Sequence, residues 1–337
     1  MLITDCDSLM KTHLPFTYRD KLTIDSVEYK ERVQIELEGL RENRGSIKTI
    51  IRLETILSEP PSSSDDFEIA SFTSADGHGI YYNKWKVENS QHVFIFLNGL
   101  ESHVGWFDNM ADSLVACGIR TYGLDRRGSG LNSRNCGGFQ DWIDDVEKLT
   151  TIARNENPVA KMHLVSICFG AKLATACAIQ QPGKYDSLIY MSPGLAVKVA
   201  PTPAEKMRIA IDQLSRTYFN IRTPIKHDEM FTSRGKALYY LYNDKLRTHS
   251  PRASDFYQAM MIDKYISKNL DKQTTPSLAL LAGNDQVVNN KKTRTVMNKF
   301  AQKPKIIQYP QSDHVIFFGK YKEEMTTDLL NYLSINT

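Results

Sequence analysis

The sequence of 337 residues lacks most of the features that mark specialised classes of protein. Its five cysteines are odd in number, scattered and free of C-x-x-C pairs, which argues against a disulfide framework or a zinc ribbon. No window approaches about 18 uninterrupted apolar residues, and residues 1–13 lack the apolar stretch of a signal peptide. We therefore expect no transmembrane segment and a cytoplasmic location.

Charge imbalance and cofactor motifs are missing as well. The 42 basic and 39 acidic side chains nearly cancel, which disfavours a nucleic-acid binder. No H-x-x-x-H or H-E-x-x-H spacing occurs, and Gly128-Ser129-Gly130 lacks the third glycine of a dinucleotide loop. We expect neither a metal nor an organic cofactor.

The apolar and charged fractions, 41% and 24%, are those of a globular protein. At about 150 residues per domain, the length fits two domains or one large domain with an insertion. Charged residues crowd positions 25–44, and a Pro- and Ser-rich stretch follows at 59–66. Residues 1–65 are thus predicted to be a partly helical N-terminal extension.

From residue 67 onwards, short apolar runs alternate with amphipathic stretches. The predicted strands are 68–73, 80–87, 92–97, 119–124, 162–167, 188–191, 278–282 and 305–309. The predicted helices between them include 106–117, 141–154 and 171–180. Such alternation indicates an α/β fold with a mostly parallel central sheet and helices on both faces. Its core would comprise residues 66–194 and 274–337.

The alternation is interrupted over residues 195–273. This stretch holds helical patterns, with Met207, Ile211 and Leu214 at helical spacing, and no clear strand. About 80 residues are too many for a loop, so we expect an inserted helical cap or lid. The stretch is rich in aromatic residues and methionine: Tyr218, Phe219, Met230, Phe231, Tyr239, Tyr240, Tyr242, Phe256, Tyr257, Met260 and Met261.

The turn after strand 162–167 has the pattern of a nucleophile elbow, G-x-S-x-G, with one change. Ser166 and Gly170 are the small flanking residues that the close approach of strand and helix requires, and Cys168 occupies the position of the nucleophile. The loop after strand 92–97 and the residue after Cys168 would supply the oxyanion hole through the backbone N–H groups of Leu100 and Phe169.

Two further segments complete a triad in chain order. Asp285 follows strand 278–282 and His314 follows strand 305–309, so nucleophile, acid and histidine occur in the order of an α/β-hydrolase. Asp313 is an alternative acid, although a residue rarely orients the ring of its neighbour. Three of the other four cysteines, Cys117, Cys136 and Cys177, are expected to be small buried apolar residues.

These motifs resemble the α/β-hydrolase superfamily, and within it the monoacylglycerol lipase and lysophospholipase-like branch. Residues 125–134, DRRGSGLNSR, are similar to the D-x-R-G-x-G-x-S-x-R segment of that branch, and residues 275–285 to its T-P-x-L…G-x-D approach to the acid. The resemblance covers about four fifths of the chain and implies an inserted lid. The chain departs from the branch at Asn98, where His is usual, and at Cys168, where Ser is usual.

A cysteine at the elbow favours acyl transfer through a thioester. A thiolate can form before attack, with His314 as base and acid and Asp285 orienting the imidazole. The predicted function is an acyl hydrolase or acyltransferase acting on an ester, thioester or lactone, with an apolar or aromatic acyl group.

Three other interpretations stay open. The substrate could be carrier-bound, on coenzyme A or an acyl carrier protein, met by Arg126, Arg127 and Arg134. The fold could be catalytically silent and bind a ligand. Cys168 could also be a substitution introduced into a serine esterase.

Overall fold

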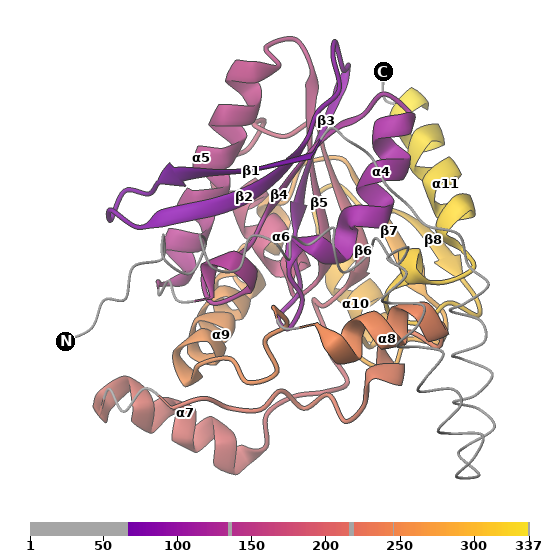
Figure 1. The fold of residues 1–337 in the computed structure, drawn as a ribbon. Helices are drawn as coiled ribbons and strands as arrows, with labels where there is room; N and C mark the ends of the chain where they lie inside the picture. The colour runs from indigo at the N-terminus through magenta and orange to yellow at the C-terminus, as the bar shows by residue number, and fades with distance from the viewer. Residues whose placement is uncertain (1–66, 134–136, 216–218, 245, 336–337) are drawn as a thin grey trace.

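A computed structural model describes residues 67–133, 137–215, 219–244 and 246–335 (Figure 1). The predicted extension over residues 1–65 lies outside these ranges, as do Cys136, Arg134 and Tyr218. Among the described residues, no helix is both long and apolar enough to cross a membrane.

An eight-stranded sheet forms the centre of the described chain. Its strands are β1 (Phe67–Thr73), β2 (Gly79–Trp85), β3 (His92–Leu97), β4 (Arg120–Leu124), β5 (Lys161–Cys168), β6 (Ser187–Pro193), β7 (Ser277–Ala282) and β8 (Lys305–Tyr309). They lie in the order β1-β2-β4-β3-β5-β6-β7-β8. The contacts of β1 with β2 and of β2 with β4 are antiparallel, and all others are parallel. Each predicted strand is present, with ends shifted by two residues or fewer.

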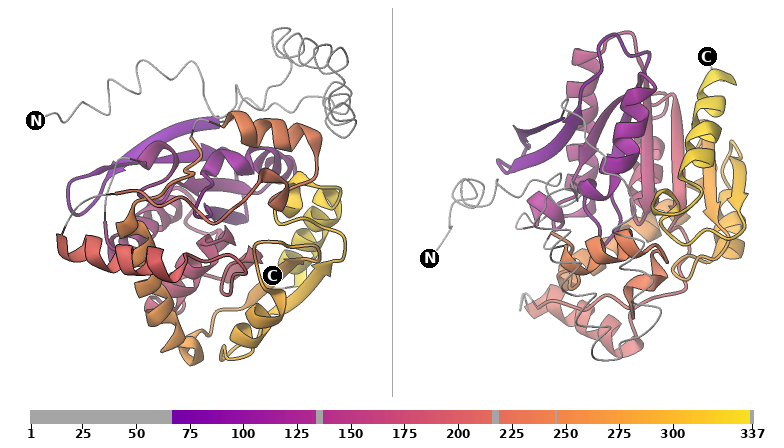
Figure 2. Two further views of the ribbon diagram at one scale, coloured as in Figure 1. Left: turned by 90° about the horizontal axis from the view of Figure 1, so that it is seen from below. Right: turned by 45° about the vertical axis from the view of Figure 1, so that its right-hand side comes forward.

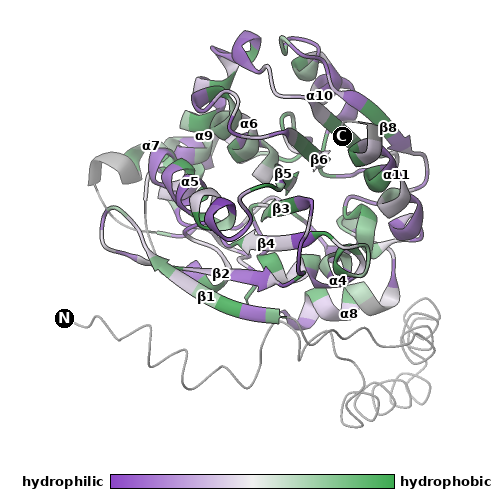
Figure 3. Cartoon of the chain, turned by 90° about the horizontal axis from the view of Figure 1, so that it is seen from above, coloured by the Kyte–Doolittle hydropathy of each residue, from purple (hydrophilic) through white to green (hydrophobic). Residues whose placement is uncertain are grey.

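Helices cover both faces of this sheet. They are α4 (Asp108–Ala116), α5 (Phe139–Glu156), α6 (Gly170–Gln180), α10 (Asn290–Met297) and α11 (Lys322–Ile335). One apolar cluster joins the sheet to α5, α6 and α10, and a second joins the opposite face to α4 and α11. Viewed along the sheet, α5 and α6 lie on one side and α4 and α11 on the other (Figure 3).

The strand sequences explain this division. In β3, Val93, Ile95 and Leu97 belong to one cluster, and Phe94 and Phe96 to the other. Because successive side chains of a strand point to opposite faces, an uninterrupted apolar run is buried on both. The predicted fold class, an α/β-hydrolase fold with a mostly parallel sheet, is confirmed.

Residues between β6 and β7 form a helical insertion. Its elements are α7 (Pro203–Ser215), η3 (Asp228–Met230), α8 (Gly235–Asn243), α9 (Ala253–Ser267) and η4 (Leu270–Lys272). These elements lie below the sheet, with α7 at the edge of the molecule beyond α9 (Figures 1 and 2). Two isolated bridges, Val197 with Val288 and Asn220 with Arg252, are its only strand-like pairings among the described residues.

The helix expected from the spacing of Met207, Ile211 and Leu214 is present as α7, but another of its residues is the buried one. Met207 and Ile211 are 67% and 51% exposed, and the side chain of Leu214 lies outside the described part. Ile209 is the buried residue, packed in a small cluster with Ile221, Ala253 and Phe256. The spacing correctly indicated a helix, but it did not identify the side that packs.

Candidate functional site

A sharp turn between β5 and α6 carries Cys168. Its backbone has φ of 51°, in the left-handed region that non-glycine residues seldom adopt, and its side chain is half-buried. Phe169 follows as the N-cap of α6 and Gly170 is the first helical residue. The turn has the geometry that a nucleophile elbow requires, with Cys168 at its apex.

Two glycines permit this turn. A Cβ on Gly170 would lie 2.3 Å from the carbonyl oxygen of Leu97, so only glycine fits where α6 passes β3. A Cβ on Gly194 would lie 2.8 Å from the carbonyl oxygen of Cys168, and the N–H of Gly194 donates to that oxygen at 2.7 Å. Gly170 follows from the motif. Gly194 lies 26 positions after Cys168, and no sequence pattern points to it.

The loop after β3 is held in shape by Asn98. Its side-chain amide donates to the carbonyl oxygen of Ser102 at 2.5 Å and to Ser129 Oγ at 3.0 Å, and its Oδ1 accepts from the N–H of Arg126 at 3.1 Å. Ser102 Oγ accepts from the N–H of Gly99 at 2.7 Å. The asparagine that departs from the family pattern therefore fixes the loop that carries Leu100.

A buried histidine and carboxylate face the elbow from two other strand ends. Nδ1 of His314 lies 2.9 Å from Oδ2 of Asp285, and both side chains are at most 1% exposed. Oδ1 of Asp285 accepts from the N–H groups of Val287 and Val288, each at 2.8 Å. Nε2 of His314 is buried and makes no hydrogen bond within the described part of the chain. The ring is thus oriented by Asp285 and keeps one nitrogen available.

The charges around His314 favour its protonated form. Burial alone would lower its pKa, but the negative charges of Asp285 and of Cys168 outweigh burial and raise the pKa of His314 to about 10. At neutral pH the ring of His314 is therefore favoured as an imidazolium, paired with the Asp285 carboxylate and close to Cys168.

The alternative acid, Asp313, has other partners. Its Oδ2 accepts from the N–H of Ser233 at 2.7 Å, and its Oδ1 accepts from the side chain of Asn284 at 3.0 Å. Asp313 therefore joins the helical insertion to the loop before His314, while Asp285 holds the imidazole.

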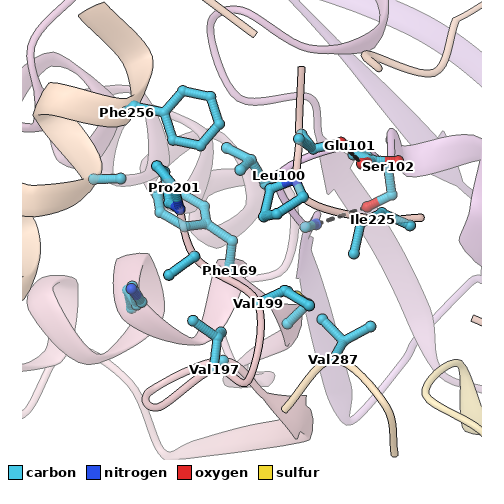
Figure 4. Close-up of a pocket in the computed structure, with 18 of the residues that line it drawn as sticks. Leu100, Glu101, Ser102, Phe169, Val197, Val199, Pro201, Ile225, Phe256 and Val287 are labelled. Carbon is cyan, nitrogen blue, oxygen red and sulfur yellow. Dashed lines mark hydrogen bonds between the residues drawn. The ribbon is translucent and has the colours of Figure 1, made fainter. Parts of the chain in front are cut away.

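Cys168, Phe169, Leu100 and His314 all line one cavity of about 310 Å³. Most of its other walls are apolar, with Val197, Val199, Ile225, Phe231, Phe256 and Val287 among them. Figure 4 shows the valines on one side of Phe169 and Glu101 with Ser102 on another. From the predicted aromatic and methionine set, Phe231, Phe256 and Met260 line the cavity, whereas Tyr242 is 81% exposed.

Both carboxylates in the cavity wall are paired with cations of this chain. Glu101 Oε2 accepts from Nη2 of Arg247 at 2.6 Å, and Asp263 Oδ2 lies 2.7 Å from Nζ of Lys172. A cavity of this kind accommodates an apolar group without offering a free negative charge to a cationic one.

Two of the arginines considered for an acidic carrier, Arg126 and Arg127, are unsuited to that role; Arg134 lies outside the described residues. Arg126 is 3% exposed and stacks on Trp142 and Phe169, with its Cζ 4.7 and 5.4 Å from the two ring centroids. Arg127 is 2% exposed and pairs with Asp145 and Asp76. Neither guanidinium is exposed, because acidic and aromatic neighbours far along the chain enclose them.

Of the other histidines and cysteines, His92 and His163 contact each other, with Nδ1 of His92 and Nε2 of His163 3.0 Å apart. Cys177 is buried as expected, and burial raises the pKa of its thiol. Cys117 was expected to be buried and is exposed, because it follows the last turn of α4. Among the described residues, no three His, Cys, Asp or Glu side chains are arranged to hold a metal ion.

Known proteins resemble this chain in sequence and fold. Residues 88–320 match the family described as serine aminopeptidase, S33. Rat monoglyceride lipase is 22% identical over 277 residues, which cover 80% of this chain and 89% of that protein. The human monoglyceride lipase is also 22% identical, over 82% of this chain and 92% of its own length.

Solved structures give the same result for the fold. A soluble variant of monoglyceride lipase from Saccharomyces cerevisiae superposes with a TM-score of 0.69 at 17% identity, over 82% of this chain and 96% of that one. The monoacylglycerol lipase of Paleococcus ferrophilus superposes with a TM-score of 0.63 at 16% identity, over 80% of this chain and 99% of that one. With more than half of its length matched to the family, this chain belongs to the serine aminopeptidase S33 family and is a hydrolase of the α/β-hydrolase fold.

Proposed function

We propose that this protein is an acyl hydrolase that works through an acyl-cysteine intermediate on Cys168. The observation that carries the proposal is the apolar cavity onto which Cys168, at the apex of a strained turn, and His314, held by Asp285, both open. Similarity to monoglyceride lipases supports an ester substrate.

The reaction divides into two acyl transfers. The Cys168 thiolate attacks the carbonyl carbon, and the electron pair of the C=O bond moves to oxygen, where the N–H groups of Leu100 and Phe169 stabilise it. As the intermediate collapses, the C–O bond breaks and His314 Nε2 gives its proton to the leaving alcohol. His314 then takes a proton from the water that attacks the thioester carbonyl. The C–S bond breaks, the carboxylic acid is released, and Cys168 is left as a thiolate.

The cavity indicates what kind of acyl group enters. Its walls are aliphatic and aromatic, and Glu101 and Asp263 are already neutralised by Arg247 and Lys172. An apolar acyl chain gains free energy from burial here, about 0.8 kcal/mol per buried CH₂. The amino group of a peptide would find no free carboxylate in this wall.

The test is turnover of p-nitrophenyl esters with acyl chains of two to twelve carbons by wild type, Cys168→Ala and Cys168→Ser. We expect Cys168→Ala to lose at least about a hundredfold in kcat/KM, because the covalent step is removed. In Cys168→Ala, kcat/KM should also no longer depend on the length of the acyl chain. Equal turnover by wild type and Cys168→Ala would contradict the proposal and favour a protein that binds without catalysis.

Two additions resolve the finer alternatives. A thioester reacts more readily with amines and thiols than with water, so product analysis with added acceptors separates transfer from hydrolysis. Free acid alone, whatever the acceptor, excludes acyltransferase activity. A Cys168→Ser variant that turns over esters much faster than wild type would indicate a site built for serine.

A further inference from the structure

A single arginine of the helical insertion contacts both halves of the proposed site. Arg247 lies between α8 and α9 and is 7% exposed. Its Nε and Nη2 donate to Oε2 of Glu101 at 2.9 and 2.6 Å, and its Nη1 donates to Asp228 at 2.7 Å. Its Cζ lies 5.0 Å from the centroid of the Phe231 ring. Each of the three guanidinium nitrogens therefore donates to a carboxylate, which fixes the position of the group.

On one side this contact reaches the loop of the oxyanion hole. Glu101 follows Leu100 directly in the chain, and its carbonyl oxygen accepts from the N–H of Thr248 at 2.9 Å. Its carboxylate also accepts from the hydroxyl of Thr223. Three residues of the insertion thus hold Glu101, and through it they restrain the backbone next to the N–H of Leu100.

On the other side the contact reaches the histidine. The ring centroid of Phe231 lies 5.8 Å from that of His314, and the carbonyl oxygen of Phe231 accepts from the N–H of Val315 at 2.8 Å. Trp106 packs edge-on against the same phenyl ring, with centroids 5.4 Å apart. Phe231 is therefore fixed between Arg247 and the imidazole.

The charge of Glu101 depends on Arg247. Burial raises the pKa of Glu101 to about 7, although the positive charges of Arg247 and Arg222 oppose that rise and Asp228 adds to it. Without the guanidinium, the buried carboxylate would be largely uncharged at neutral pH, and its hydrogen bonds to the insertion would change.

We propose that Arg247 is a positioning residue that sets the oxyanion loop through Glu101 and the imidazole through Phe231 at the same time. This inference rests on the proposed acyl-cysteine function. It predicts that losing the Arg247–Glu101 pair slows formation of the acyl-enzyme while affecting substrate binding less.

The test uses a double variant that removes both charges together. Arg247→Met with Glu101→Gln removes both charges of the buried pair and leaves Asp228, whose side chain is 24% exposed, without Arg247. It is expected to fold, since replacing both partners of a buried pair costs little. We expect kcat to fall about tenfold to a hundredfold, in line with small displacements of catalytic groups, and KM to change by less than about threefold. Arg247→Lys, which keeps the charge but not the fork of donors, should give an intermediate kcat.

A matched control is available in the same chain. Arg127 likewise joins a buried carboxylate, Asp145, to a more exposed one, Asp76, and does not line the cavity. Arg127→Met with Asp145→Asn should match the first double variant in its loss of thermal stability but keep kcat within about threefold of wild type. Equal losses of kcat in both double variants would reduce Arg247 to a structural role and overturn the inference.

A second readout does not require an ester. Alkylation of Cys168 by iodoacetamide at about pH 7, followed by peptide mass spectrometry, reports on the reactivity of the thiol, because the thiolate is the form that reacts. We expect the alkylation of Cys168 to slow at least about tenfold in the Arg247→Met, Glu101→Gln variant. Unchanged alkylation together with unchanged kcat overturns the inference. If wild type shows no Cys168-dependent turnover, the proposed function fails, and the alkylation rate alone decides for or against the role of Arg247.

Discussion

At the scale of single residues, the site depends on one cysteine in an unfavourable backbone conformation. A non-glycine residue with positive φ costs about 1–3 kcal/mol, and Cys168 accepts this at φ of 51°. The surrounding contacts, from Gly170 and Gly194 to the hydrogen bond on its carbonyl oxygen, hold it there. The result is a thiol presented beside the N-terminus of α6 and within the electrostatic reach of His314.

This arrangement predicts how His314 titrates. Because the negative charges of Asp285 and Cys168 raise the pKa of His314 to about 10, the ring is protonated below that pH and neutral above it. Cys168→Ala removes one of the groups that raise this pKa, so the pKa of His314 should fall. Histidine ¹⁵N chemical shifts followed against pH would measure the change. As a control, Cys117→Ala removes an exposed thiol and should leave the pKa of His314 unchanged. A pKa of His314 that is the same in Cys168→Ala as in wild type would contradict the interaction assigned between Cys168 and His314.

At the scale of elements, three neighbouring strands are joined by one chain of side-chain contacts centred on the buried His163. His92 on β3 contacts His163 on β5, and Nδ1 of His163 lies 2.7 Å from Ser187 Oγ on β6. Phe94 packs edge-on against His163. Burial, with the nearby charges of His92 and Lys161, lowers the pKa of His163 to about 3. The chain therefore requires a neutral His163.

A neutral buried histidine makes the sheet sensitive to acid. The unfolded chain binds a proton at His163 near pH 6.5 and the folded chain does so only near pH 3, so this stabilisation is complete above about pH 6.5 and is lost as the pH falls towards 3. At about pH 5 the loss amounts to about 2 kcal/mol. Urea unfolding at about pH 7.5 and pH 5 should show a smaller pH dependence for His163→Asn than for wild type. His78→Asn, at an exposed histidine, should follow wild type, and equal slopes for all three proteins would contradict this role.

At the scale of the whole molecule, patterns along the chain were sufficient for the sheet and for placing Cys168, Asp285 and His314 after three of its strands. Strand ends and the elbow follow from local apolar runs and small residues, which is why Cys168, Asp285 and His314 could be named in advance. The roles of Asn98 and Gly194 could not, because each depends on a contact with a distant segment.

The helical insertion shows the same limit. Its helical character follows from spacing, but the exposure of Met207 depends on what packs beneath α7. The pairing of Glu101 with Arg247 spans 146 positions, and no periodic pattern connects them. The burial of Arg127 likewise depends on Asp76, which is 51 positions away. Long-range pairing of charges is the part of this site that only the folded chain defines.

The central claim is that Cys168 becomes acylated, and trapping the intermediate tests it most directly. Wild type is mixed with p-nitrophenyl butyrate, quenched in acid within milliseconds to seconds, and examined by intact mass and by peptide mapping. The account predicts one added butyryl group, on the peptide that holds Cys168, which appears before steady-state turnover and is absent from Cys168→Ala. Turnover of the ester with no adduct at any time, or with the butyryl group on another residue, would contradict it.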